Sequence, residues 1–421
     1  MTIISLICLG LFSISVISGL SKSKDFFSPA RMFVIIWTLA LGLADLKLSR
    51  FQHIWSSQSW MMIIIAILSF LLGTYVSFVN NIDKRLSNID DIRSLFNLEK
   101  DERKRLFKAI FYLFLTYGIC LLMEIYLEGY IPIFTGRPDL ARIEFGVFGI
   151  HLFVNSQLVI MYFCIAFILL TKSTKKEKFI IWSIFLFTAL SFFTLLQRFN
   201  YFVWAILTLS MIYYSSKFIR PNKIILTGFI FFLLLYAIQE IRLSRYLQSY
   251  IYITSAMKYS SKYAAFTEPY MYICMNLENF TRAVDKLQDY SFGFLSFDWI
   301  FALTGMKKSI LTYFNVNDRP FIISGYNTFP FMWYYFSDFG VIGVGFISFF
   351  QGLAISEIYY RMRVKPSFLL ITLYSFCVVF LVLSFFTNVF TMLNFFFYIF
   401  LSIIICNYVF DKTGIIKIYK S

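Results

Sequence analysis

The chain has few of the side chains that proteins use to hold metals or to form cross-links. Its 421 residues include only two histidines, His53 and His151, so a cluster of histidine ligands around a metal ion is excluded. The six cysteines form no Cys-x-x-Cys pair, and five of them lie in apolar segments, which argues against a disulfide framework and a zinc site. We expect neither a metal nor an organic cofactor.

Charged residues are also scarce. They make up 14% of the chain, against about a quarter of an average soluble domain, while 59% of the residues are hydrophobic. Lys and Arg are absent from the central spans of eleven apolar runs, most of which approach the ~20 residues that a helix needs to cross a bilayer. The runs lie near residues 2–19, 32–44, 60–79, 109–127, 152–170, 179–196, 200–216, 224–240, 331–358, 367–386 and 391–410.

The runs lack the two-residue alternation of barrel strands, so they predict an all-α, polytopic integral membrane protein with about eleven transmembrane helices. No Gly/Ser-rich linker or internal repeat divides the sequence, and we expect one transmembrane domain over residues 1–421. The first run lacks a basic start and a cleavage motif, which predicts a retained helix rather than a signal peptide. A net charge of +15 would indicate nucleic-acid binding in a soluble protein. Here loop orientation explains most of it, and no nucleic-acid partner is expected.

The basic residues are distributed unevenly between alternate loops. The odd-numbered loops and the C-terminal tail hold 24 Lys and Arg residues, whereas the short even-numbered loops hold five. Because cytoplasmic loops of membrane proteins carry an excess of Lys and Arg, the first group is predicted to be cytoplasmic. The N-terminus is then outside and the C-terminus inside. The second run is short, and without it the N-terminus would move inside while the later loops kept their sides.

One outer loop is much longer than the others and covers residues 241–325. Long loops are translocated whatever their charge, so its nine Lys and Arg residues do not contradict the assignment. Within it, residues 268–287 are predicted to form an amphipathic helix. We expect Tyr272, Met275, Phe280 and Val284 on one face and Glu278, Arg282, Asp285 and Lys286 on another. Because long ordered loops are usually functional, we predict a helical extracytoplasmic cap over residues 241–325.

Six arginines occupy unusual positions in the predicted outer loops. Arg137 and Arg142 lie in an otherwise apolar loop, and Arg198 lies in a turn of only a few residues. The other three are Arg242 and Arg245, three apart after the eighth run, and Arg319 before the ninth. Guanidinium groups bind phosphate bidentately and stay charged in poorly hydrated sites, which favours a pyrophosphate ligand. Each arginine could instead extend to lipid headgroups, as basic residues at helix ends do.

Several carboxylates could act as a general base, because an acid in apolar surroundings becomes a better base near neutral pH. The candidates in or beside outer loops are Asp139, Glu144, Glu240 and Asp338. Each could form a local ion pair instead, and Asp338 could cap a helix. Glu124 lies inside a run, where a carboxylate is a functional suspect, although an interfacial position is equally compatible. His151 is a further candidate base.

Aromatic residues and glycines gather around the start of the ninth run. Tyr326 and Trp333 fit either an interfacial belt or a surface that stacks on sugar rings. Gly340, Gly343 and Gly345 form a small-residue face that favours the close approach of another helix.

The chain resembles the bacterial O-antigen polymerases of the Wzy type, the oligosaccharide repeat unit polymerases. The resemblance covers most of the chain as architecture, with ten to twelve helices, arginine-bearing outer loops and one large late outer loop. Its local parts are the segment with Arg137 and Arg142, Arg198 in its short turn, and the stretches 325–330 and 337–343, the second with Asp338-Phe339-Gly340. The resemblance implies a GT-C-like fold and a multi-pass protein of the bacterial inner membrane.

The resemblance also implies an activity and a set of site residues. The enzyme would be a metal-independent glycosyltransferase that joins repeat units on undecaprenyl pyrophosphate at the outer face of the inner membrane, in O-antigen or lipopolysaccharide synthesis. Partners would be these lipid-linked oligosaccharides, membrane lipid and a candidate chain-length regulator. Arg137, Arg142, Arg198, Arg242, Arg245 and Arg319 would bind pyrophosphate, and Arg198 would also stabilise the leaving group. Glu144, Glu240 or Asp338 would deprotonate the acceptor hydroxyl, and Tyr326, Asn327 and Tyr263 would hold the sugars.

Three other membrane protein classes are possible. An O-antigen ligase relies on a histidine in its outer loop, and residues 241–325 contain none. A lipid-linked oligosaccharide flippase usually has twelve or more helices with two-half symmetry, which the long cap argues against. A membrane O-acyltransferase would need a histidine at mid-membrane or in a cytoplasmic loop, and neither His53 nor His151 fits.

Overall fold

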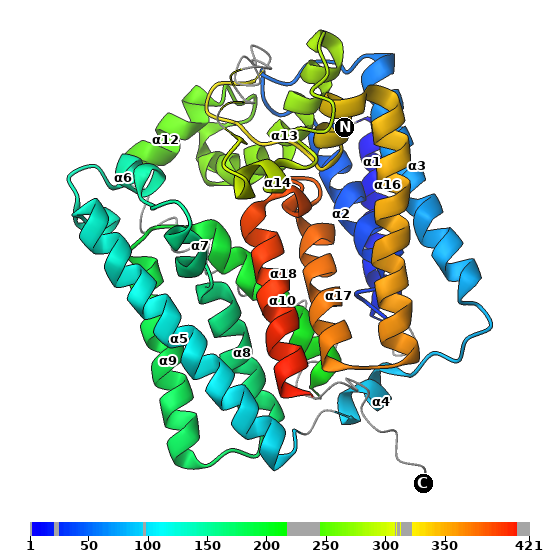
Figure 1. The fold of residues 1–421 in the computed structure, drawn as a ribbon. Helices are drawn as coiled ribbons and strands as arrows, with labels where there is room; N and C mark the ends of the chain where they lie inside the picture. The colour runs from blue at the N-terminus through cyan, green and yellow to red at the C-terminus, as the bar shows by residue number, and fades with distance from the viewer. Residues whose placement is uncertain are drawn as a thin grey trace. The chain divides into compact units, whose positions relative to one another are not determined.

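The computed structural model describes residues 2–20, 25–95, 98–216, 245–307, 309, 312 and 322–410. The regular secondary structure in these ranges is helical, apart from one isolated antiparallel bridge between Ser49 and Met257 (Figure 1). The prediction of an all-α protein is confirmed for this part of the chain.

Ten of the eleven apolar runs coincide with helices, and the eighth run, 224–240, lies outside the described residues. All eight prolines lie outside the eleven runs, so none breaks a helix within them. The helices are α1 (Ile3–Gly19), α2 (Pro29–Ala44), α3 (Ser57–Asn80), α5 (Lys100–Glu128), α7 and α8 (Ile150–Val154 and Gln157–Leu170), α9 (Lys175–Phe193), α10 (Arg198–Ser215), α16 (Met332–Val364), α17 (Phe368–Leu383) and α18 (Leu393–Val409).

Among the described residues, four helical stretches are long and apolar enough to cross a membrane, namely Ser57–Asn80, Lys100–Phe134, Ile150–Leu170 and Met332–Val364. Four more apolar helices, α1, α2, α17 and α18, have 16 or 17 residues each. This composition supports association with a membrane.

The chain divides into two compact units that are both discontinuous in the sequence. Unit 1 consists of Met1–Asp83, Arg220–Glu357 and Phe380–Met392. Unit 2 consists of Lys84–Ile219, Ile358–Val379 and Leu393–Ser421. Because each unit combines distant segments, no single linker in the sequence marks a boundary between them.

In unit 1, α3 and α16 cross with their backbones in contact at two glycines. A Cβ atom on Gly73 would lie 2.0 Å from the carbonyl oxygen of Phe349, and one on Gly352 would lie 2.2 Å from that of Phe70. The sequence analysis assigned close helix approach to Gly340, Gly343 and Gly345 instead. A Cβ on Gly345 would make only ordinary contact, 3.5 Å from Ile65, because the crossing lies about two turns further along α16.

The described part of the predicted cap is mostly helical. It contains α12 (Arg245–Thr254), the 3-10 helix η2 (Ser261–Phe266), α13 (Thr267–Lys286) and α14 (Asp298–Leu303). Helix α13 matches the helix predicted over residues 268–287 within one residue at each end. Two residues of α13 were predicted on the wrong side. Glu278, predicted on the charged face, is fully buried, and Tyr272, predicted on the apolar face, is 51% exposed. Polar groups of the protein, instead of water, bind the carboxylate of Glu278.

Helix α16 is interrupted at Gly340, whose φ of +60° and ψ of −145° are not helical. The interruption frees carbonyl groups one turn earlier, and those of Ser337 and Asp338 accept hydrogen bonds from the backbone N–H groups of Ser291 and Phe292 at 2.9 and 3.2 Å. The segment after α13 is thereby attached to the broken turn of α16.

Unit 2 is a bundle in which α8 packs on α5, α9, α10 and α18 (Figure 1). At one end of the bundle, Arg93 of the short helix α4 (Ile89–Ser94) donates from Nε to the carbonyl oxygen of Tyr213 at 2.7 Å. Arg363 donates to the carbonyl oxygen of Ser87 at 3.0 Å. Two arginines from predicted cytoplasmic loops thus bind backbone carbonyls of unit 2.

Candidate functional site

Arg198 lies at the start of α10, directly after a strained turn in unit 2. Helix α9 ends at Phe193, and Leu196 in the following turn has a φ of +59°, a conformation that costs a non-glycine residue roughly 1–2 kcal/mol. The turn places the exposed side chain of Arg198 at the first residue of α10. The N-cap residue of α10 makes no side-chain hydrogen bond to the first N–H groups of the helix. These N–H groups and the guanidinium of Arg198 lie at the same helix end.

The loop that follows α5 lies against the same turn. Ile133, in the 3-10 helix η1 (Pro132–Phe134), donates its backbone N–H to the carbonyl oxygen of Thr194 at 3.1 Å. Arg137 comes four residues after Ile133, and Arg198 comes four residues after Thr194. Arg142 and Glu144 lie further along, in the short helix α6 (Pro138–Glu144), and all these charged side chains are exposed. The structure therefore brings the loops of three predicted arginines together in one unit.

A buried carboxylate and a histidine lie beneath these loops. Glu124, in the last turns of α5, is fully buried, and its Oε1 accepts a hydrogen bond from Val147 N at 2.9 Å. Its two oxygens lie 3.0 and 3.1 Å from Nδ1 of His151 on α7. The other imidazole nitrogen, Nε2, lies 3.2 Å from the side-chain amide nitrogen of Gln197, the residue before Arg198.

The cap residues that were predicted to hold sugars lie in unit 1. Asn279 of α13 donates to the carbonyl oxygens of Tyr326 and Thr328 at 2.6 and 3.2 Å and so fixes the segment that contains them. The hydroxyl of Tyr326 pairs with that of Ser255 at 2.8 Å, and partial burial raises the pKa of this tyrosine. Asn327 and Tyr263 have exposed side chains.

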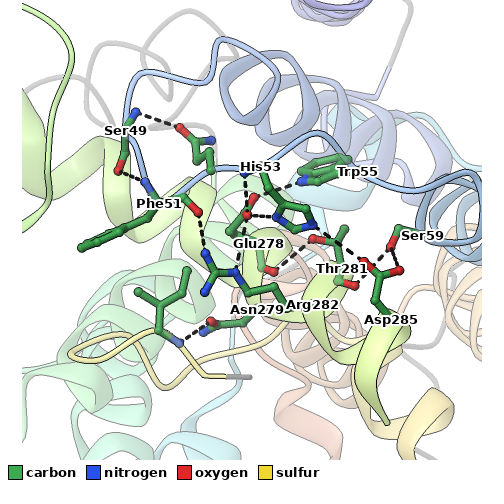
Figure 2. A network of polar contacts seen from close by, with 12 residues as sticks. Ser49, Phe51, His53, Trp55, Ser59, Glu278, Asn279, Thr281, Arg282 and Asp285 are labelled. Atoms are coloured by element: carbon green, nitrogen blue, oxygen red, sulfur yellow. Dashed lines mark hydrogen bonds and ion pairs between the residues drawn. The ribbon is translucent and has the colours of Figure 1, made fainter. Parts of the chain in front are cut away.

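Glu278 of α13 is the centre of a second polar network, also in unit 1. Figure 2 shows it between His53, Trp55 and Arg282. Its Oε1 accepts the backbone N–H of His53 at 2.9 Å and a short hydrogen bond from Nδ1 of the same histidine. Its Oε2 accepts from Nε1 of Trp55 at 3.0 Å. Nε of Arg282 lies 3.7 Å from Oε1. The network attaches the cap to the connection between α2 and α3.

Further contacts strengthen this attachment. Asp285 accepts from the hydroxyl of Ser56 at 2.7 Å. It also lies 3.8 Å from Nε2 of His53 (Figure 2). Lys47, in the same connection, lies 4.1 Å from the centre of the Trp55 ring, and its amino nitrogen is buried without a hydrogen-bond partner. Burial lowers the pKa of Lys47, although the nearby carboxylates of Glu278 and Asp45 act in the opposite direction.

Asp338, one of the predicted bases, is fully buried and has three donors in unit 1. Its Oδ1 accepts from the hydroxyl of Ser291 at 2.5 Å and from Leu295 N at 3.0 Å, and its Oδ2 accepts from Ser296 N at 2.6 Å. Both oxygens thus hold the segment that leads into α14. This is a structural role that the sequence analysis did not assign.

Several predicted residues cannot be placed. Glu240, Arg242 and Arg319 lie outside the described residues, and the side chains of Arg245 and Asp139 are likewise not described. Among the residues that the structure does describe, no group of three or more His, Cys, Asp or Glu side chains is positioned to hold a metal ion.

The sequence analysis missed the partners of both histidines. Each histidine is bound through Nδ1 by a fully buried glutamate, His151 by Glu124 and His53 by Glu278. One signal was available for Glu124, which lies inside an apolar run, because a buried acid needs a partner. The partner of Glu278 was not readable, because His53 and Glu278 are separated by 225 residues.

Comparisons of the chain with models of known protein families, with curated proteins and with solved structures find no match. Assignment of a function therefore depends on the residues and geometry described above.

Proposed function

We propose that this protein is a membrane glycosyltransferase of the O-antigen polymerase kind, which elongates a glycan carried on a polyprenyl diphosphate at the outer face of a bacterial inner membrane. The observation that carries the proposal is the grouping in unit 2 of the loops with Arg137, Arg142 and Arg198 through the Ile133–Thr194 hydrogen bond. Guanidinium groups from two neighbouring loops suit the several oxygens of a diphosphate.

The position of Arg198 supports an anionic ligand further. The N-terminal N–H groups of α10 are not capped by a side chain, and a helix N-terminus favours negative charge. A diphosphate bound at this end would accept hydrogen bonds from the helix and from Arg198. As the glycosidic bond to the diphosphate breaks, the same groups would stabilise the charge that develops on the leaving oxygen.

Transfer of sugars from a lipid carrier also accounts for the rest of the chain. Eleven transmembrane helices, an outer N-terminus and an inner C-terminus would place these arginines and the cap on the same side of the membrane. The cap, with its exposed Tyr263 and Asn327, would then hold the glycan, and a chain-length regulator would act on the same complex.

The experiment that tests the proposal replaces Arg198 with Ala in a strain that lacks its own copy of the gene. We expect the lipopolysaccharide ladder to collapse to core with a single repeat unit. Affinity of the purified protein for undecaprenyl pyrophosphate should fall about 10- to 100-fold, the value of a charged hydrogen-bonded contact. Arg198→Lys should restore only part of the ladder, because an ammonium group cannot bind two oxygens in parallel.

Lys176→Ala is the matched control. Lys176 is an exposed basic residue at the opposite end of α9, so its replacement removes the same charge far from the loops of the arginines. The control should keep a full ladder. Full ladders from Arg137→Ala, Arg142→Ala and Arg198→Ala alike would refute the proposal.

An O-antigen ligase is the second candidate, and one structural observation favours it. The cap itself has no histidine, but His53 is bound to Glu278 on the cap helix α13, which supplies a histidine there from another loop. The two functions give different products in a gene deletion. Loss of a polymerase leaves single repeat units on the lipid A core, whereas loss of a ligase leaves the core bare.

A further inference from the structure

The hydrogen bonds of His151 fix which of its nitrogens carries a proton. A carboxylate only accepts hydrogen bonds, so Nδ1, which lies 3.0 and 3.1 Å from the two oxygens of Glu124, is the donor. The lone pair of the imidazole is therefore on Nε2. This is the arrangement in which a buried carboxylate orients a histidine to accept a proton at its other nitrogen.

The lone pair of Nε2 faces the turn that contains Arg198. The side-chain amide nitrogen of Gln197 lies 3.2 Å from it. Asn200 donates to the oxygen of the same amide at 3.4 Å and to the oxygen of Asn155 at 2.9 Å, which orients the NH2 group of Gln197 toward the histidine. The proton acceptor on α7 is thus in contact with Gln197, the residue next to the proposed phosphate-binding Arg198.

The imidazole is also held rigidly. A Cβ atom on Gly146 would lie 3.0 Å from Cγ of His151 and 3.1 Å from its Nδ1, so the glycine backbone packs closely against the ring. On another side, the ring of Phe145 meets the imidazole edge to face at 6.4 Å. The side chain of His151 is nevertheless 23% exposed, so a substrate can reach it.

The other described acids near this position are less suited to the task. Glu144 is exposed on α6 and lacks the apolar surroundings that make a carboxylate basic. Glu128, one turn beyond Glu124 on α5, accepts from Gly146 N at 3.3 Å. Glu124 itself is fully buried behind the histidine.

We propose that His151, oriented by Glu124, is the general base that deprotonates the acceptor sugar hydroxyl in the proposed glycosyl transfer, on which this assignment rests. The hydroxyl takes the place of the Gln197 N–H at Nε2 and gives its proton to that nitrogen. Its oxygen bonds to the anomeric carbon of the donor, and the bond from that carbon to the diphosphate oxygen breaks. The diphosphate leaves with the electron pair beside Arg198, and the imidazolium returns its proton to water after release of the lipid.

The test uses full-length protein in liposomes with purified undecaprenyl-pyrophosphate-linked repeat units. Chain elongation is measured against pH for wild type, His151→Gln and Glu124→Gln. We expect His151→Gln to lower the rate about 100- to 10,000-fold, the usual contribution of a general base. We expect the rate of wild type to fall on the acidic side and that of this variant to be independent of pH there, while affinity for undecaprenyl pyrophosphate stays within about twofold of wild type.

Glu128→Gln is the matched control for Glu124→Gln, because it makes the same change one turn away on the same helix. It should leave the rate and the pH profile unchanged. Added imidazole should restore part of the rate of His151→Ala but none of the rate of Arg198→Ala, since only the first variant lacks a base. This rescue also separates a missing base from a misfolded protein.

Two outcomes overturn the assignment while the proposed function stands. One is a wild-type rate and pH profile in both His151→Gln and Glu124→Gln. The other is a loss of rate in His151→Gln that is matched by an equal loss of lipid diphosphate affinity. A wild-type protein that binds the lipid-linked units but elongates no glycan overturns the proposed function, and this assignment with it.

Discussion

Gly73 of α3 and Gly352 of α16 lie at one helix crossing where the two backbones touch. A Cβ atom on Gly73 would lie 2.0 Å from a carbonyl oxygen of α16, and one on Gly352 would lie 2.2 Å from a carbonyl oxygen of α3. Packing and weak Cα–H···O contacts at such crossings take the place of a hydrophobic driving force in lipid.

Either glycine should therefore be intolerant of a methyl group. We expect Gly73→Ala and Gly352→Ala each to destabilise the protein by about 1–3 kcal/mol or more, because the helices must separate. Thermal unfolding in detergent measures the effect. Gly345→Ala on the same helix α16, where an added Cβ would meet Ile65 at 3.5 Å, is the control and should unfold like wild type. Equal stability of all three variants would contradict the crossing.

Asp338→Ala should destabilise the segment that leads into α14. The change leaves the N–H groups of Leu295 and Ser296 without their acceptor, at about 1–3 kcal/mol for each buried group. We expect faster proteolysis after residue 291, with glycan elongation retained at low temperature. Normal stability combined with complete loss of elongation would instead indicate that Asp338 is the catalytic base.

Glu278 should be the residue on which attachment of the cap depends most. Glu278→Ala removes the acceptor of His53 N, His53 Nδ1 and Trp55 Nε1, and it leaves Arg282 without its ion pair. Breaking such a buried charged network costs about 3–5 kcal/mol. Limited proteolysis of α13 should accelerate accordingly. Asp285→Asn, at the exposed margin of the network, is the comparison and should cost less than about 1 kcal/mol.

Lys47 should make stability depend on alkaline pH. Burial lowers its pKa in the folded protein, so the unfolded chain holds the proton to a higher pH than the folded one does. Stability contributed by this residue therefore rises with pH between the lowered pKa and the ordinary lysine value near about 10.4. Lys47→Met should remove that rise. The difference between the wild-type and Lys47→Met stability curves measures it, and parallel curves would exclude the effect.

Gly146→Ala should disturb His151 without touching any charged group. The added methyl group would lie 3.0 Å from the imidazole ring and push Nδ1 away from Glu124. We expect elongation to fall while lipid diphosphate binding is kept. Gly149→Ala is the comparison, because Gly149 also has a positive φ, +82°, but the added Cβ atom would lie in open space. The pair of variants therefore separates the effect of backbone strain from that of displacing the ring. An identical effect of both variants would mean that strain alone is responsible.

The sequence alone determined the helical class and the positions of most helices. Apolar runs that lack proline, and that lack Lys and Arg in their central spans, must satisfy their own backbone hydrogen bonds in a bilayer, which leaves a helix as the local solution. It also singled out the loops of Arg137, Arg142 and Arg198, because a guanidinium group in a short apolar connection is unusual whatever the tertiary structure.

Only the tertiary structure decided which groups share a site. Three contacts join residues that are 27 to 225 positions apart in the sequence, namely the hydrogen bond between Ile133 and Thr194, the pairing of Glu124 with His151 and that of His53 with Glu278. Helical periodicity predicts a face, but it does not reveal whether water, lipid or another side chain covers that face. For this reason the sequence analysis placed Glu278 on the solvent side. In the structure it is fully buried, because three hydrogen-bond donors compensate for the loss of water around its carboxylate.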